Sequence, residues 1–221
     1  MIFLFAVLLA AATTAAPPAA ASSDAAASVE GLVSRWSFEK DAPGANAVAS
    51  GPSLRIEKAA IAEGRQGTAL AFEDWSLKDY LHPDPGSATR AVLPAEHAGD
   101  LGGSYPMKVS AWIYPTADPI YYGGIVERGY GYGASFRLIL HRGLRVGGSV
   151  GRVVLKSATP IGLNAWHEVT LQADGRKAVL IVDGVEAATA DIPSPERPAS
   201  KDAVVIGERF SGRIDEVSIA R

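Results

Sequence analysis

The chain has 221 residues, enough for one large all-β domain, since sandwiches and barrels of roughly 200 to 250 residues often form a single unit. Its 21 basic and 24 acidic residues give a net charge of −3 and are interspersed from Glu30 onward, so we exclude nucleic acid and anionic lipid surfaces as partners. The absence of cysteine excludes disulfides, thiolate zinc sites and thiol catalysis.

The N-terminus has the pattern of a secretory leader. Residues 1–12 are apolar, small residues and prolines follow, and the first charged side chain is Asp24. The apolar run is shorter than the ~20 residues that cross a bilayer, so we predict a signal peptide over residues 1–21 and a linker over residues 22–28. We therefore expect a secreted or periplasmic protein whose mature domain is not inserted in a membrane. The run lacks Lys and Arg, which leaves an uncleaved N-terminal anchor as the alternative.

From residue 29 to residue 221 the pattern is that of β-structure. Short runs with period-two alternation or β-branched character stand between glycines and prolines, and no helix-length amphipathic stretch occurs. We predict an all-β domain, a two-sheet antiparallel jelly-roll sandwich. The predicted strands are 32–38, 68–72, 107–114, 124–128, 135–141, 144–149, 152–157, 166–172, 178–182, 203–207 and 212–219.

Two tight turns are predicted locally. Asp174-Gly175 joins two alternating runs over residues 171–182, and the chain reverses again at Asp183-Gly184. An Asp-Gly pair supplies the positive φ that a hairpin turn requires. Three consecutive strands should therefore form a meander within one sheet.

Six segments follow one another in a recognisable order: GLVSRWSFE (31–39), GRQGTALAF (64–72), VSAWIYP (109–115), WHEV (166–169), LIVDG (180–184) and FSGRIDEV (210–217). Their order resembles the LamG-like jellyroll family of the concanavalin A-like lectin/glucanase superfamily. The chain departs from the family pattern at residues 82–91, which look like an insertion. The resemblance implies the sandwich fold, but this fold hosts lectins, adhesive modules, hydrolases and lyases, so it does not fix the function.

Catalytic patterns are missing. Retaining hydrolysis needs two carboxyls about 5 to 5.5 Å apart, which a Glu-x-Asp-x-Glu strand would supply. Here the acidic pairs Glu73-Asp74 and Asp215-Glu216 are adjacent, so their side chains should diverge, and among the acids only Asp215 has a sequence context that suggests burial. Residues 147–151 match Gly-x-Ser-x-Gly, but a strand rather than a helix follows, so we predict a hairpin instead of a nucleophile elbow. We expect no enzymatic activity.

Aromatic side chains provide the candidate ligand-binding residues. Tyr121, Tyr122, Tyr130 and Tyr132 lie beside glycines that indicate exposed turns, and we expect them to contribute to one surface at an edge of the sandwich. Trp75 lies in the segment that departs from the family and could join them. An exposed Tyr suits a sugar ring or a protein surface, while packing against the sandwich is the alternative.

Three other tryptophans, Trp36, Trp112 and Trp166, fall in predicted strands, and we interpret them as core or sheet-face residues.

Asp215 is the candidate metal ligand. It shares strand parity with Val217 and Ile219, so if those two face the core its carboxylate should point inward or sit at the rim, and a buried carboxylate needs compensation. The family resemblance implies calcium as a possible structural ion at this position. The alternative, which we favour because no other acids adjoin Asp215 in a calcium loop, is a carboxylate that accepts hydrogen bonds from free backbone N–H groups.

Together these features favour an extracytoplasmic, non-catalytic binding module for carbohydrate. The alternative is a protein-interaction or envelope-structural domain that binds a cell-surface or extracellular protein with the same loops. A glycan-active hydrolase or lyase is the third and least favoured hypothesis.

Overall fold

The fold was obtained as a computed structural model, which describes residues 31–73, 88–99, 101, 104–130, 134–193 and 201–221. The predicted signal peptide and linker lie outside this part of the chain. The elements are β1 (Leu32–Trp36), β2 (Arg55–Glu57), β3 (Ala60–Glu63), β4 (Thr68–Phe72), β5 (Arg90–Leu93), α2 (Ala95–Ala98), β6 (Met107–Pro115), β7 (Tyr122–Arg128), β8 (Phe136–His141), β9 (Arg145–Val150), β10 (Val153–Lys156), β11 (His167–Ala173), β12 (Lys177–Val182), β13 (Val185–Asp191), β14 (Val204–Ile206) and β15 (Gly212–Ala220).

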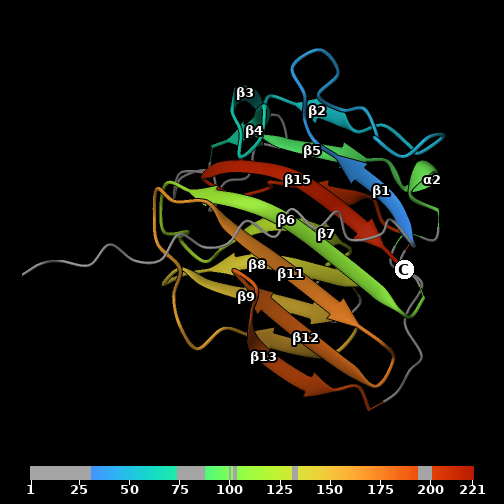
Figure 1. Ribbon diagram of the computed structural model, residues 1–221, viewed down its shortest axis with the longest axis vertical. Helices are drawn as coiled ribbons and strands as arrows, with labels where there is room; N and C mark the ends of the chain where they lie inside the picture. Colours follow the sequence, from blue (N-terminus) through green and yellow to red (C-terminus); the bar gives the residue numbers. More distant parts are fainter. Residues whose placement is uncertain (1–30, 74–87, 100, 102–103, 131–133, 194–200) are drawn as a thin grey trace, which may run out of the picture.

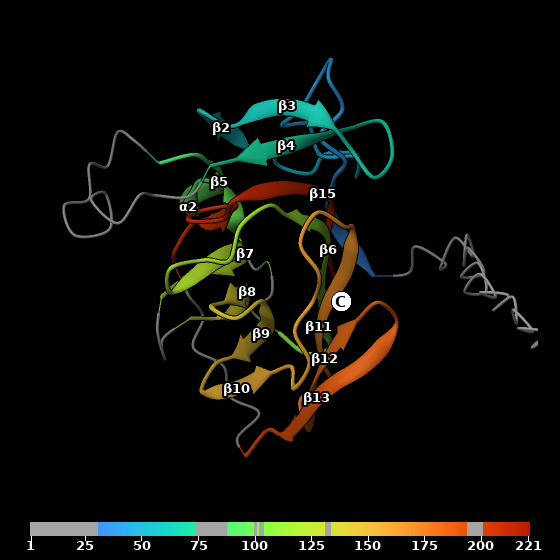
Figure 2. The same ribbon diagram turned by 90° about the vertical axis from the view of Figure 1, so that its left-hand side faces the viewer.

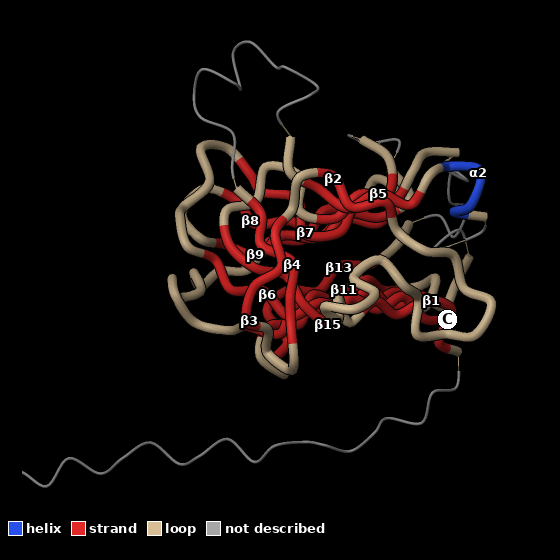
Figure 3. The backbone as a smooth tube through the Cα atoms, turned by 90° about the horizontal axis from the view of Figure 1, so that it is seen from above, coloured by secondary structure: helices blue, strands red, loops and turns tan. Residues whose placement is uncertain are grey.

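The strands form two antiparallel sheets that face each other (Figures 1 and 3). One sheet has eight strands in the order β13-β12-β11-β6-β15-β4-β3, with β1 also paired to β15. The other has seven strands in the order β10-β9-β8-β7-β14-β5-β2. The predicted all-β, two-sheet jelly-roll sandwich is confirmed. Among the described residues, no helix is long and apolar enough to span a membrane.

The core lies between the sheets because successive side chains of a strand point to opposite faces. In β8, Phe136, Leu138 and Leu140 are buried against the facing sheet, and burial of each such side chain contributes roughly 1.5–3 kcal/mol. The sheets pack closely: a Cβ added at Gly148 on β9 would lie 2.9 Å from a methyl carbon of Leu171 on β11. The alternate side chains of each strand therefore point away from the core and form the outer faces of the sandwich.

The predicted meander is confirmed. β11, β12 and β13 are consecutive neighbours in the eight-stranded sheet and lie side by side in Figure 2. Gly175 has φ +96°, and Asp183 and Gly184 have φ 51° and 78°, as tight reversals require.

The three tryptophans predicted on strands divide between core and surface. Trp36 on β1 is fully buried in the core, and its indole N–H donates to the Pro52 carbonyl at 3.2 Å. Trp112 on β6 and Trp166, directly before β11, are partly exposed. The outward parity of Trp112 makes it a sheet-face residue.

Candidate binding surface

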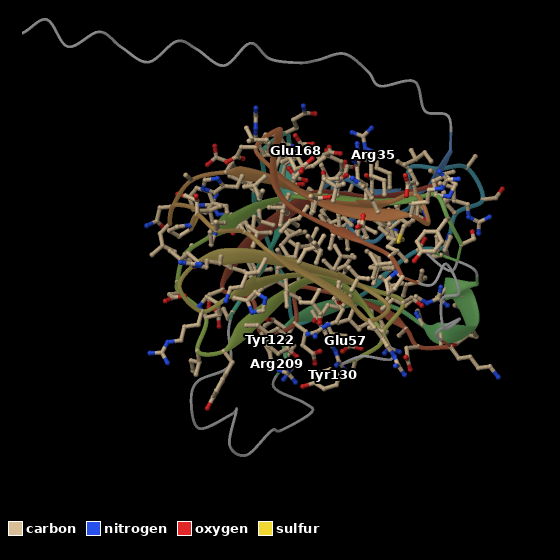
Figure 4. All side chains as sticks on the ribbon, turned by 90° about the horizontal axis from the view of Figure 1, so that it is seen from below. Arg35, Glu57, Tyr122, Tyr130, Glu168 and Arg209 are labelled. Atoms are coloured by element: carbon tan, nitrogen blue, oxygen red, sulfur yellow. The ribbon has the colours of Figure 1, made fainter. Side chains whose placement is uncertain are left out.

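The outer face of the seven-stranded sheet carries a compact set of aromatic and charged side chains. Strand register places Tyr122 of β7 opposite His141 of β8, and Glu127 opposite Arg137, so these four side chains share one face. Figure 4 shows Tyr122, Tyr130 and Arg209 on this side of the sandwich, with Arg35 and Glu168 on the other. We call Tyr122, Glu127, Tyr130, Arg137 and Arg209 the tyrosine–arginine cluster.

Arg137 is the centre of this cluster. Its Cζ atom lies 4.8 Å from the centroid of the Tyr122 ring and 5.4 Å from that of the Tyr130 ring, within the range of cation–π attraction. Its Nε donates to Glu127 Oε1 at 2.6 Å. Its Nη2 is buried and has no hydrogen-bond partner in the described part of the chain. One donor of this guanidinium is thus unsatisfied among the described residues.

Tyr122 is held from its other side by Arg209. The Arg209 Cζ atom lies 5.3 Å from the ring centroid, and its Nη1 donates to the Tyr122 hydroxyl. Burial and the nearby Glu127 carboxylate both raise the pKa of Tyr122. A side-chain hydrogen bond to Tyr130 raises this pKa further, so the hydroxyl stays protonated and links the two tyrosines.

Glu127 is a buried acid that sequence reasoning missed, since only Asp215 was expected to be buried. It is 7% exposed, and burial raises its pKa while Arg137 opposes that rise. Its carboxylate lies over Gly124, where an added Cβ would be 2.1 Å from Glu127 Oε2. Nothing in the sequence around Glu127 indicates that Gly124 leaves space for its carboxylate or that Arg137 on the next strand pairs with it. The sequence therefore did not reveal this site.

A depression of about 180 Å³ adjoins the cluster on the same face. Arg137, His141 and Ser149 supply its polar groups, and Ile139 and Val154 supply apolar surface. Burial, with Lys156 and Arg137 nearby, lowers the pKa of His141, so the ring is neutral near pH 7. An apolar depression with a few converging polar groups is typical of a small-ligand site.

The predicted tyrosines are only partly brought together. Tyr122 and Tyr130 meet at Arg137, and Tyr130 is 73% exposed. Tyr121 is also exposed and directly precedes β7. Tyr132 and Trp75 lie outside the described residues.

Asp215 accepts three backbone hydrogen bonds. Its Oδ2 accepts from the N–H groups of Arg65 at 2.8 Å and Gln66 at 3.2 Å, and its Oδ1 accepts from Glu216 at 2.8 Å. Burial raises the pKa of Asp215 to about 6 although these donors lower it. The described residues contain no group of three His, Asp or Glu side chains that could hold a metal ion. Donors rather than oxygen ligands surround the carboxylate, so this geometry favours the capping alternative over calcium.

The two hydrolase-like patterns do not form catalytic arrangements. Residues 147–151 run along β9 into the turn before β10, so the predicted hairpin is confirmed. Glu216 sits at an irregularity in β15 with φ 49° and pairs with Arg35 at 2.6 Å, while Asp215 is buried. The two adjacent carboxylates therefore serve separate structural contacts.

Three solved structures illustrate the similarity of this fold to known proteins. Domain 4 of an extracellular GH43 arabinanase from Geobacillus stearothermophilus, in complex with arabinotriose, matches with a TM-score of 0.62 and 14% identity over 86% of this chain and 92% of that one. The binding domain of Paraclostridial Mosquitocidal Protein 1 matches with a TM-score of 0.66 and 14% identity. The receptor-binding domain of a botulinum neurotoxin C/D mosaic serotype matches with a TM-score of 0.64 and 13% identity.

Both toxin matches cover 86% of this chain and 48% of the toxin domain, so the chain spans about half the length of these neighbours. At such identities the similarity shows the fold. No curated protein sequence matches the chain. A sequence profile described as "Concanavalin A-like lectin/glucanases superfamily" matches residues 86–221, which is more than half of the chain. The chain therefore belongs to the concanavalin A-like lectin/glucanase superfamily.

Proposed function

We propose that this protein is an extracytoplasmic, non-catalytic module that binds carbohydrate through the tyrosine–arginine cluster. The observation that carries the proposal is the position of Arg137 beside two tyrosine rings, of which the Tyr130 ring is 73% exposed. The ring thus presents an accessible aromatic face next to a guanidinium that Glu127 fixes in place.

The chemistry of the surface suits a saccharide. The exposed face of Tyr130 offers apolar area for the C–H side of a sugar ring, and its hydroxyl offers a hydrogen bond. His141 and Ser149 in the adjacent depression add polar groups for further hydroxyls. The arabinotriose complex of the arabinanase domain, whose fold is similar, supports a saccharide rather than another ligand class.

The carboxylates near the cluster support a binding role over catalysis. Glu127 is paired with Arg137 at 2.6 Å, and Glu208 is paired with Arg90 at 3.2 Å. A glycosidase needs one carboxylate free to attack or activate water and one acid free to donate a proton. Both carboxylates here are engaged by arginine.

The test is a glycan-array screen and a pull-down with the purified protein and two variants of one residue. Tyr130→Ala removes the ring, whereas Tyr130→Phe keeps it and serves as the matched control. A dominant saccharide whose binding falls about tenfold in Tyr130→Ala, and less than threefold in Tyr130→Phe, is expected from loss of stacking.

Two outcomes would contradict the proposal. A dominant protein partner without a saccharide would select the protein-interaction alternative. Release of reducing sugar from the bound glycan, lost on Glu127→Gln, would select an enzyme.

A further inference from the structure

The opposite outer face, on the eight-stranded sheet, carries a second aromatic surface. Trp112 and Tyr114 stand two residues apart on β6, on its outward parity, and both are partly exposed. The Tyr114 ring lies 5.5 Å from that of Trp166, centroid to centroid, with the planes inclined by 58°. These three rings form a continuous row across β6 and the start of β11.

Two arginines lie over this row. The Cζ atom of Arg65 is 4.7 Å from the Trp112 centroid, and that of Arg213 is 4.5 Å from the Tyr114 centroid. We call Arg65, Arg213 and the three rings the arginine-capped row. The two ring–arginine pairs are roughly 6.5 Å apart along the strand, which is comparable with the size of one sugar ring.

Among the described residues, no ion pair neutralises the charges of this row. In the described structure neither Arg65 nor Arg213 forms a salt bridge, and Arg213 Nη1 donates to the Glu63 carbonyl at 3.0 Å. On the seven-stranded face, by contrast, Arg137 and Arg90 both pair with glutamates. The guanidinium edges of the row can therefore donate to an anion, for which their fork geometry is suited.

The row is also held in place before any ligand binds. The Asp215 carboxylate accepts hydrogen bonds from the backbone N–H groups of Arg65 and Gln66. The Gly64 N–H donates to the Gly67 carbonyl at 3.1 Å. An added Cβ at Gly64 would lie 2.7 Å from Asp215 Oδ2, so the turn fits tightly around this carboxylate. Pre-organisation of this kind lowers the entropic cost of binding.

We infer that the arginine-capped row is a second binding site, which takes an anionic saccharide, with Arg65 and Arg213 contacting its carboxylate or sulfate groups and the exposed parts of the three rings lying beside the sugar. The site is independent of the tyrosine–arginine cluster because it lies on the other face of the sandwich. A domain with both sites would bind two saccharide chains, or two parts of one, on opposite faces.

The test is calorimetric titration of the full chain with polygalacturonate and, separately, dextran sulfate, which distinguish carboxylate from sulfate. Methyl-esterified polygalacturonate and dextran are the neutral controls. We expect binding to at least one anionic polymer that weakens as salt increases, and loss of about tenfold in affinity for Arg65→Gln and for Arg213→Gln.

Three further variants make the result specific. Arg152→Gln removes one exposed charge in the β9–β10 turn and should leave the affinity within about twofold. Glu168→Gln removes the acid that pairs in register with Trp112 and should strengthen binding about twofold. Tyr130→Ala, which tests the cluster, should have no effect. Binding to neither polymer, or equal affinities for Arg65→Gln and Arg152→Gln, would overturn the inference.

Discussion

Arg137 and Glu127 form an ion pair in which both side chains are largely removed from water, with exposed side-chain fractions of 14% and 9%. Two charges in such surroundings depend on each other, because removal of one leaves the other desolvated and uncompensated. The pair also fixes the guanidinium between the two tyrosine rings. Stability and ligand binding are therefore coupled at this residue.

Substitution of this arginine should be costly for the fold. Arg137→Met is expected to lower the free energy of unfolding at pH 7 by about 3 kcal/mol, because buried Glu127 loses its partner. Urea denaturation measures the change, and Arg152→Met is the exposed control. The double variant Arg137→Met with Glu127→Gln should recover part of the loss. A loss below about 1 kcal/mol for the single variant would contradict a buried pair.

Asp215 should give the stability a distinctive pH dependence. Its pKa is about 6 in the folded protein, above the ordinary value of 3.8, so the folded state binds the proton more tightly than the unfolded state. This contribution is fully present below about pH 4 and is lost as the pH rises through about 6. The stability of the natural protein relative to Asp215→Asn should therefore fall between pH 4 and 7. Denaturant unfolding across this range measures it, and a difference that is constant or grows with pH would contradict the raised pKa.

Calcium binding at Asp215 stays a prediction of the family resemblance, and the melting temperature tests it. A ligand that binds only the native state stabilises it by mass action. The capping geometry predicts equal melting temperatures in calcium and in chelator. An increase in calcium that disappears in Asp215→Asn would establish a metal site instead.

At the scale of elements, the two sheets pack so closely at Gly207 that only glycine fits there. Gly207 follows β14 with φ +79°, and an added Cβ would lie 2.2 Å from Cδ1 of Phe72 on β4 in the facing sheet. Gly143 has the same φ but no heavy atom within 4 Å of such a Cβ. A comparison of the two glycines therefore distinguishes the cost of the positive φ from the cost of a steric clash between the sheets.

Alanine at these two glycines should therefore have unequal costs. Gly143→Ala is expected to lower the free energy of unfolding by about 1 kcal/mol, from the positive φ alone. Gly207→Ala adds a clash with a buried ring and should cost about 3 kcal/mol. Urea denaturation of both variants measures the difference, and equal values would show that Phe72 moves aside at no cost.

Elements with local signals could be predicted from the sequence, and elements defined by distant partners could not. All eleven predicted strands coincide with observed strands to within a few residues, because alternation and Asp-Gly turns are local properties. β2 has three residues and β3 is mostly exposed, so neither has the alternation of a half-buried strand. β5 lies between β2 and β14, and its pairing with β14 joins residues more than a hundred positions apart.

In the candidate site, too, only the residues with a local sequence signal could be predicted. Tyr122 and Tyr130 were predicted from the glycines beside them. Arg137 and Glu127 were not, because their roles depend on the register between β7 and β8, which fixes which side chains share a face. The arginine-capped row was missed for a similar reason, since Arg65 reaches Trp112 from a turn that is distant in sequence.

At the scale of the whole molecule, the sandwich separates two outer faces with different electrostatic character. The seven-stranded face pairs Arg137 and Arg90 with carboxylates, while the eight-stranded face carries Arg65 and Arg213 without ion pairs among the described residues. Binding to the first face should therefore depend weakly on salt, and binding to the second strongly.

Backbone amide chemical-shift mapping during titration with the dominant saccharide of the array tests the central claim most directly. The account predicts that the largest shifts cluster on β7, β8 and β9, at Tyr122, Arg137 and Ser149, and that they are lost in Tyr130→Ala. Shifts confined to residues distant from this face, or no saturable shifts with any saccharide, would contradict the assignment of a carbohydrate-binding surface to the tyrosine–arginine cluster.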